Sequence, residues 1–488
     1  MAFADFPDSV KALLQANFLV REMEEGLDSI LAYRRLAIQE VFPGRIGETM
    51  TRTRKGRRAP VSTPISVGAP GATTNLDNGL NPLANPWSVE QYTFTLEEYA
   101  DTIDLNLMQE QTGIADQFIA NARNNGVQAA QSLERICRSK LFGAYLSGNS
   151  RIIADPADAI VGTVEANDTP INNAASGNLN LDDVRGFQTV LLQSGSSSGK
   201  VVAVSTTNKL PVVITKANGT QYAGNVTAVT VYTYETPTYS VLDLTNTPDA
   251  VPGWITFENL SGSDYSFTVG DTIVANDAPA ILRPFSRRNT KLLTGSDVLS
   301  LGIIEDAVAY LRDNGIPPMD DGTYHCVLDN TSLRQLFADQ DFKVLFAGRS
   351  QSTEWRDGDI IRLLGITYIP TTEAYVQPAI GTAVEKPAVR VRRPVIAGAE
   401  SIIQGNFDGM QSWMAQRGFD RADSNIAMVD GVVQIVREPL DRLQQVVAMT
   451  WTWIGDYAVP TDITATPTII PTAGAARYKR CVTIEHAG

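Results

Sequence analysis

Three residues match a known catalytic motif. Gly195, Ser197 and Gly199 have the Gly-x-Ser-x-Gly spacing of the nucleophile elbow, the turn that presents the catalytic serine of many hydrolases. That turn needs a strand before the serine and a helix after it. Here a predicted helix precedes the motif and a predicted strand follows it, and the chain has only two histidines to act as the base. We therefore interpret the motif as a flexible linker.

The same residues approach the spacing of a phosphate-binding loop. Lys200 follows Gly199, but the loop is one residue short, and Val201 stands where a serine or threonine would bind magnesium. No helix is expected after it, so no row of backbone N–H groups would point at a phosphate. The motif does not predict nucleotide binding.

An imidazole and a thiol are adjacent at His325 and Cys326. They lie in a predicted strand, so their side chains should point to opposite faces, whereas a catalytic pair must share a face. The aspartates at 320, 321, 339 and 341 could bind a metal, but they lack the spacing of a calcium loop and are better interpreted as solvated turn residues. We therefore expect no enzymatic activity, no metal and no cofactor.

A basic cluster is conspicuous in this acidic chain. It could be a solvated loop, a nucleic-acid contact, or a contact with acidic surface on a neighbouring copy of the chain. The last is preferred, because a loop with few apolar residues cannot offset its own ordering entropy, whereas complementary charge from another subunit could order it. The cluster comprises Arg52, Arg54, Lys55, Arg57 and Arg58.

Length and charge narrow the function classes. With 488 residues, the chain exceeds what one hydrophobic core usually supports, so two or three domains are expected. Asp and Glu number 54 against 40 Lys and Arg, a net charge of −14. Such a chain is poorly suited to gripping DNA phosphates, although it could enclose DNA without holding it tightly.

Cysteine usage and hydropathy suggest where the chain is made. Cys137, Cys326 and Cys481 are too far apart to predict a disulfide framework or a zinc cluster. No apolar run is long enough for a membrane span, and the first residues lack the pattern of a secretory signal. Synthesis in a reducing cytoplasm is therefore expected.

Apolar periodicity predicts the helices. Residues 9–40 have a helical pattern whose weakest position is Gly26, and residues 113–146 have the strongest pattern, which predicts a helix of about 45–50 Å. Between them, residues 45–90 are rich in Gly and Pro and predict a long extended loop, which ends in an alternating, strand-like stretch at 87–107. Shorter helices are expected at 181–193, with Asn180 as the cap, at 296–313 and at 330–337.

Strands are expected mainly in the second half of the chain. Val, Thr and Tyr dominate residues 200–281, which predict a small all-β module inserted between helical segments. Further strands are expected at 324–328, at 363–370, at 446–454, where Gly455 should turn the chain, and at 477–485.

The order of these parts resembles the major capsid proteins of tailed phages, which share the fold named after phage Hong Kong 97. The loop from Arg45 to Val89 looks like the extended E-loop of that family, and the run starting Gly113-Ile-Ala-Asp looks like its spine helix. Three later runs look like axial-domain and late peripheral-domain strands: Tyr324-His-Cys-Val-Leu-Asp-Asn330, Gly358-Asp-Ile-Ile-Arg-Leu-Leu-Gly-Ile-Thr-Tyr-Ile-Pro370 and Trp451-Thr-Trp-Ile-Gly455.

The resemblance implies an α+β, Hong Kong 97-like capsid fold with an inserted all-β domain. Its expected parts are an N-terminal helical arm (1–44), an extended E-loop (45–98), a peripheral domain with the spine helix (99–150), the start of an axial domain (151–194), the inserted β-rich domain (195–290), the rest of the axial domain (291–430) and C-terminal strands that return to the peripheral domain (431–488).

The implied function is structural. The chain would assemble into hexamers and pentamers of an icosahedral shell that encloses double-stranded DNA without sequence-specific binding. Scaffolding, portal and decoration proteins would be its partners, the bacterial cytoplasm its place of assembly, and the virion its destination, with no membrane involved. The loop at 45–89 is expected to find its resting place only on an adjacent copy. The alternatives are an encapsulin-like nanocompartment shell that encloses cargo enzymes and a secreted adhesin.

Overall fold

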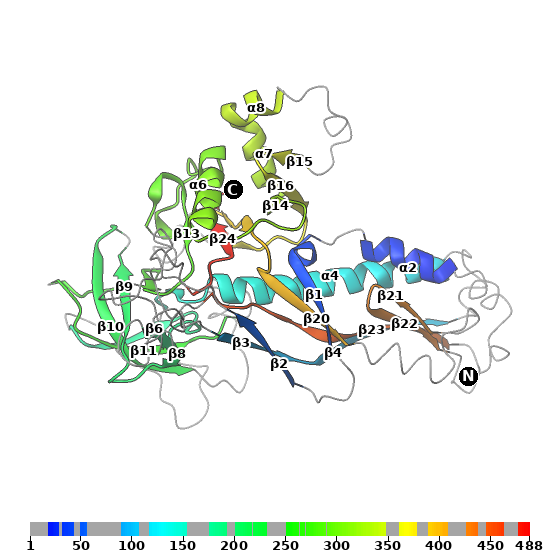
Figure 1. Cartoon of the computed structure of the whole chain (residues 1–488), viewed down its shortest axis with the longest axis horizontal. Coiled ribbons are helices and arrows are strands. Elements are labelled where there is room, and N and C mark those ends of the chain that lie inside the picture. Colours follow the sequence, from blue (N-terminus) through cyan, green and yellow to red (C-terminus); the bar gives the residue numbers. More distant parts are fainter. Residues whose placement is uncertain are drawn as a thin grey trace, which may run out of the picture.

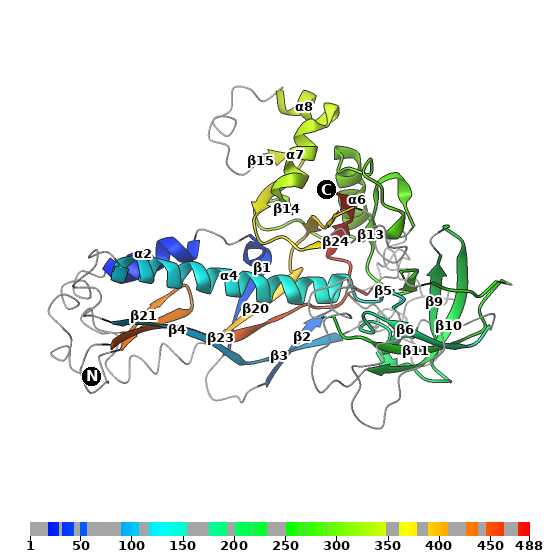
Figure 2. The same cartoon turned by 180° about the vertical axis from the view of Figure 1, so that it is seen from behind.

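The computed structural model describes most of the chain. The described residues are 18–28, 32–42, 49–55, 89–106, 117–153, 175–192, 201–216, 218–231, 250–262, 264–268, 270–288, 290–347, 361–377, 389–407, 426–437, 446–462 and 477–488. They form a long body, a lobe beside it and a β-rich module at one end (Figure 1). Figure 2 shows the same three parts from behind.

The body is one long helix on one sheet. The helix α4 (Gln117–Tyr145) has 29 residues, as the strong periodicity predicted. The strands run in the order β1-β20-β23-β22-β21, and β4 also pairs with β23; only the β1–β20 pairing is parallel. Their bounds are β1 Ala37–Phe42, β4 Glu97–Asn106, β20 Ile402–Phe407, β21 Ile426–Val429, β22 Val432–Arg437 and β23 Val446–Ala458.

The packing of helix on sheet follows from the apolar stripe of α4. Leu133, Cys137 and Leu141 are fully buried and belong to the same core as Trp451 and Trp453 of β23. Burial of such aliphatic and aromatic side chains contributes about 1.5–3 kcal/mol each. This core connects residues far apart in the sequence.

The turn predicted at Gly455 is wrong, because β23 continues through it to Ala458. A Cβ on this residue would lie 2.5 Å from the carbonyl oxygen of Gly405 on β20 and 2.4 Å from the Trp453 ring. Glycine therefore permits close approach of a neighbouring strand and an indole at this position.

The helix predicted over 9–40 is wrong after Asp28. The structure has α2 at Phe18–Asp28, a 3-10 turn at Arg34–Leu36, and then β1. Two tertiary interactions override the helical pattern: β20 pairs with β1, and the buried Glu134 carboxylate of α4 accepts hydrogen bonds from the backbone N–H groups of residues 32–34. Residues 9–17 lie outside the described part of the chain.

The lobe is a sheet covered by short helices. Its helix α6 (Leu301–Asp313), strand β14 (Tyr324–Asp329) and helix α7 (Asn330–Ala338) confirm the predicted elements there. The predicted strand pair at 363–370 is also confirmed. The remaining elements are β13 (Ile281–Leu282), α8 (Gln340–Ala347), β15 (Ile361–Leu363), β16 (Ile366–Thr371), β19 (Val395–Ala397) and β24 (Cys481–Ile484), and a small sheet of β17 (Val376–Gln377), β18 (Val391–Arg392) and β25 (His486–Ala487).

The β-rich module confirms the all-β composition predicted for residues 200–281, but its sheet includes strands from outside that range. The order is β5-β12-β9-β10-β11-β6, beside a two-stranded sheet of β7 and β8. The bounds are β5 Asn149–Arg151, β6 Gly177–Leu181, β7 Thr189–Leu191, β8 Val201–Ala203, β9 Leu210–Thr215, β10 Gln221–Val231, β11 Gly253–Glu258 and β12 Thr272–Ala275.

The helix predicted at 181–193 is wrong. Asn180, its expected cap, lies in β6 opposite Trp254 of β11. The following residue but one, Asp182, is fully buried and accepts hydrogen bonds from Ser150 and Arg151, which fixes the chain in an extended path. Pairing with distant strands therefore determines this segment, because its local helical pattern is weaker than these contacts.

The α+β fold class predicted from the sequence is confirmed. Among the described residues, no helix is long and apolar enough to cross a membrane.

Candidate functional site: the hairpin base and its groove

A β-hairpin carries the basic residues singled out in the sequence. Strands β2 (Thr49–Lys55) and β3 (Val89–Thr95) pair in antiparallel register, with Thr49 opposite Thr95 and Lys55 opposite Val89. The hairpin forms a separate two-stranded sheet along one side of the body (Figure 1). Arg52, Arg54 and the backbone of Lys55 lie within it, whereas Arg57 and Arg58 lie outside the described residues.

The hairpin is fastened to its own chain by an apolar contact. Met50 and Phe94 are buried and cluster with Ile403 of β20 and Ala458 of β23. Side chains alternate along a strand, so Met50, Arg52 and Arg54 share one face. The two arginines therefore point in the same direction as the apolar contact.

The acidic partners of these arginines come from the same chain. The Arg52 Nε lies 3.2 Å from Glu40 Oε2 of β1, at the surface. The Arg54 guanidinium lies 2.6 Å from Glu400 Oε2 and 3.7 Å from Asp462 Oδ1, with only 15% of its side chain exposed. Arg480 binds the same two carboxylates, so a cluster of two cations and two anions holds the hairpin base.

The expectation that this loop rests only on an adjacent copy is wrong for the loop's two described ends. Residues 49–55 and 89–95 dock on their own body, because alternation directs their apolar and basic face toward β1, β20 and β23. Residues 56–88 lie outside the described part of the chain. The intersubunit role of Arg52, Arg54, Lys55, Arg57 and Arg58 stays a prediction.

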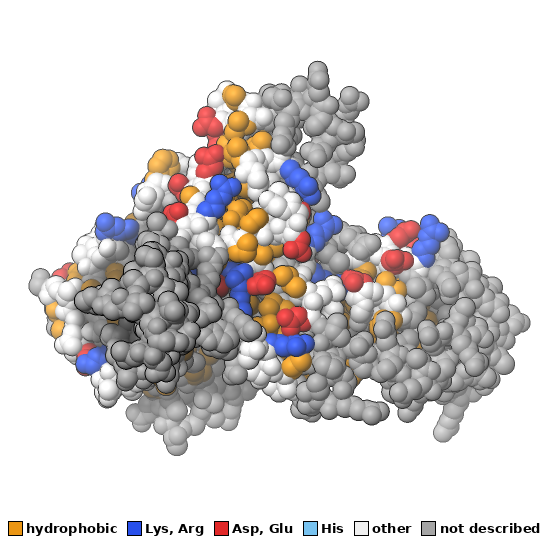
Figure 3. All heavy atoms as spheres, in the orientation of Figure 1, with side chains coloured by type: hydrophobic (Ala, Val, Ile, Leu, Met, Phe, Trp, Pro, Cys, Tyr) orange, Lys and Arg blue, Asp and Glu red, His pale blue; other side chains and the backbone are white. Residues whose placement is uncertain are grey.

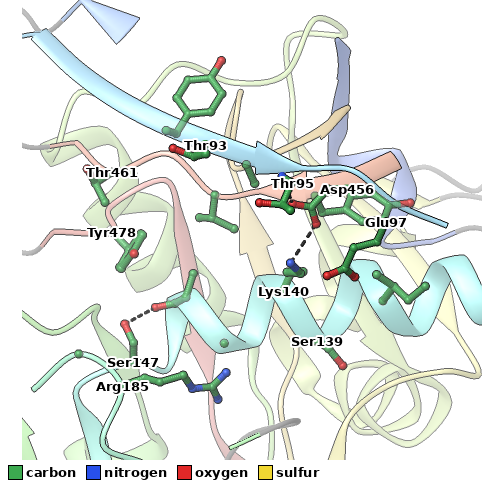
Figure 4. A pocket seen from close by; sticks show the side chains of 18 of the residues that line it. Thr93, Thr95, Glu97, Ser139, Lys140, Ser147, Arg185, Asp456, Thr461 and Tyr478 are labelled. Atoms are coloured by element: carbon green, nitrogen blue, oxygen red, sulfur yellow. Dashed lines mark hydrogen bonds and ion pairs between the residues drawn. The ribbon is translucent and has the colours of Figure 1, made fainter. Parts of the chain in front are cut away.

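A groove of about 1070 Å³ lies between the hairpin, α4 and the end of β23 (Figure 4). Thr93 and Thr95 of β3 face Ser139 and Lys140 of α4 across it, and the Lys140 Nζ lies 2.9 Å from Asp456 Oδ1.

The other cations of this groove also have carboxylate partners. These pairs are Arg135 with Glu373, Arg185 with Asp183, and Arg477 with Asp277. The groove thus has mixed, internally paired charge, which suits contact with another protein surface better than capture of a free anion.

The other residues that could carry chemistry do not converge on a site. His325 and Cys326 face opposite sides as predicted: the imidazole Nε2 lies 3.0 Å from Asp321 Oδ2, whereas the thiol is in the lobe core. Burial raises the pKa of Cys326 to about 12, so its thiol is unreactive at neutral pH. Asp339 accepts a hydrogen bond from the Leu301 N–H at the start of α6.

No metal-binding group of three or more His, Cys, Asp or Glu exists among the described residues. Residues 195–199, with the serine motif, are outside them.

Sequence reasoning missed a buried polar network in the lobe. The Ser332 hydroxyl lies 2.8 Å from His486 Nε2 and also hydrogen bonds Asp329, which pairs with Arg392. Ser332 and His486 are 0% exposed, so this serine and histidine cannot meet a substrate. Burial lowers the pKa of His486 to about 4, which favours a neutral, structural imidazole. The only signal was a histidine inside a predicted strand, which does not distinguish such a role.

The hairpin arginines should contribute unequally. Arg54→Gln should loosen the hairpin by about 1–3 kcal/mol, because two partly buried carboxylates would lose a cation, whereas Arg52→Gln, at an exposed pair, should cost at most about 1 kcal/mol. Hydrogen exchange of the amides in 49–55 and 89–95 measures this. Equal protection in the two variants would contradict the Arg54 cluster as the fastening.

No family model matches the sequence, and no curated protein matches it. Solved structures that it is similar to include the capsid of Ralstonia phage GP4, with 9% identity over 93% of this chain and 87% of that chain and a TM-score of 0.46. The cyanophage Pam1 capsid asymmetric unit has 8% identity, over 92% and 89%, and a TM-score of 0.42. The capsid of Helicobacter pylori bacteriophage KHP30 has 8% identity, over 92% and 88%, and a TM-score of 0.40.

Proposed function

We propose that this chain is a structural major capsid protein that assembles into a closed icosahedral shell of hexamers and pentamers. The shell would enclose double-stranded DNA inside a virion, after assembly in the bacterial cytoplasm. The seven-part division made from the sequence belongs to this proposal, with the body as peripheral domain, the lobe as axial domain and the hairpin as the base of the E-loop.

The observation that carries the proposal is the thin, two-layer body. α4 would be about 44 Å long and lies on one face of the sheet. On β4, Glu98, Thr102 and Asp104 are exposed, and the Thr102 hydroxyl hydrogen bonds that of Thr450 at 2.8 Å on an open surface. A slab with one open face has a large surface for its volume and can join copies edge to edge, as a shell requires.

The charge balance supports enclosure of DNA without tight binding. The net charge is −14, and the described hairpin arginines are paired with carboxylates of the same chain. Phosphate contacts would require free cations. Packaged DNA would therefore stay mobile against the inner wall. Scaffolding, portal and decoration proteins complete the proposed set of partners.

Expression of the chain with and without a scaffolding protein, followed by electron microscopy, tests the proposal. Hollow particles or hexamer sheets are the expected products, since obligate interfaces of this class often bury about 2,000–5,000 Å². A stable monomer under both conditions would contradict it. Particles purified from cells that contain cargo protein instead of DNA would favour the alternative, a nanocompartment shell.

A further inference from the structure

A strained loop holds an aromatic side chain in solvent. Phe285 and Ser286 follow β13 and have φ angles of 53° and 52°, in the left-handed region that non-glycine residues avoid. Phe285 is 78% exposed, the largest value among the exposed large hydrophobic residues described. Each such residue costs of the order of 1–3 kcal/mol, so the surrounding structure has to impose this conformation.

Buried ion pairs impose it from both sides. The Arg283 Nε lies 2.8 Å from Glu485 Oε2, and the Arg287 Nε lies 3.3 Å from Asp297 Oδ2; both carboxylates are 0% exposed. The loop between the two arginines is therefore a rigid support. Exposed aromatics on rigid supports are typical anchors of protein interfaces, because they lose little conformational entropy on binding.

A matching apolar surface lies elsewhere on the same chain. Helix α8 buries Phe342 but exposes its next turn, with Val344 at 62% and Leu345 at 40%. Figure 3 shows hydrophobic side chains running down from this tip of the lobe, over α8 and α7. The strained loop and α8 are different elements, so a contact between them on two copies would be heterologous, the type that closes into rings.

Charge favours the same pairing. Beside Phe285, the exposed Arg288 donates to the Gly219 carbonyl and has no carboxylate partner among the described residues. The first turn of α8 begins with the exposed Asp341, and α6, whose Leu301 N–H binds Asp339, exposes Glu305 and Asp306. A basic loop would thus meet a surface with several carboxylates.

We propose that Phe285 of one copy packs against Val344 and Leu345 of the next copy, with Arg288 facing the carboxylates around α8. The contact rests on the proposed function, because it requires assembled copies. It would close the ring of subunits within one capsomer.

Disulfide trapping tests this contact in assembled particles. The double variant Phe285→Cys with Leu345→Cys should form bonds between copies under mild oxidation, since packed side chains bring Cβ atoms within bonding range. A ladder of multimers on a non-reducing gel is expected. The matched control pairs Phe285→Cys with Val201→Cys, whose position is also 40% exposed but lies on β8. The native Cys137, Cys326 and Cys481 are buried and should not contribute.

The outcomes separate the two proposals. A wild-type chain that forms no particles overturns the proposed function. Particles of the Leu345 double variant that give only monomer bands, or no more multimer than the Val201 control, overturn the Phe285 contact and leave the shell function standing. If the double variant does not assemble, Phe285→Ala is compared with Val201→Ala: at least tenfold fewer particles for Phe285→Ala alone support the contact, and equal yields overturn it.

Discussion

Replacing Glu485 by glutamine is expected to destabilise the lobe by about 3–5 kcal/mol, because it removes one partner of a buried ion pair. Glu485 is 0% exposed and lies 2.9 Å from Arg393, whose side chain is also 0% exposed, and 2.8 Å from Arg283. Thr290 donates to the same carboxylate at 2.7 Å. Glutamine can accept some of these hydrogen bonds but leaves two buried guanidinium charges without an anion.

Hydrogen exchange of lobe amides is the right measurement, since a chain with three parts need not unfold in one step. The control is Glu258→Gln on the β-rich module, where the pair with Lys209 is partly exposed and should contribute at most about 1 kcal/mol. A loss of protection in the lobe no larger than the loss that Glu258→Gln causes in its own module would show that the buried cluster contributes little.

The same cluster predicts acid sensitivity. Burial alone would raise the pKa of Glu485, but Arg283 and Arg393 outweigh it and lower the pKa from 4.5 to about 2. The unfolded chain then binds the proton first, so lobe stability should fall as the pH falls from 4.5 toward 2. His486, with a pKa lowered by burial from 6.5 to about 4, acts in the same direction between those values. Glu485→Gln should remove the more acidic part of this dependence.

Gly126→Ala should displace α2 from α4, although alanine is the better helix former by about 1 kcal/mol. A Cβ at Gly126 would lie 2.4 Å from the carbonyl oxygen of Met23, and one at Gly26 would lie 2.6 Å from that of Arg123. These neighbours are backbone atoms, which cannot rotate away. Overpacking of this kind costs about 1–3 kcal/mol.

The matched control for Gly126→Ala is Gly302→Ala, in α6, where no atom lies within 4 Å of an added Cβ. That variant should gain up to about 1 kcal/mol from helix propensity alone. Hydrogen exchange of α2 and β1 separates the two cases, with faster exchange for Gly126→Ala and none for Gly302→Ala. Unchanged protection in Gly126→Ala would mean that the two helices can separate slightly at no cost.

Local pattern alone identified the elements whose own residues determine them. The α4 stripe, α6, β14 with the Asp329-capped α7, and the alternating β23 were all predictable, because periodicity and capping act within one segment. The order of these parts was enough for the resemblance to phage capsid proteins. None of these patterns specifies which residues from distant segments meet.

Tertiary contacts determined the rest. Gly26 was the weak point of a predicted helix by sequence and is the close contact with α4 in space. The helical pattern after Asp28 yields to pairing with β20, and the hairpin arginines find Glu40, Glu400 and Asp462 on their own body. These outcomes depend on which segments come together: a buried carboxylate or an unpaired strand edge outweighs a local preference of a few tenths of a kcal/mol per residue.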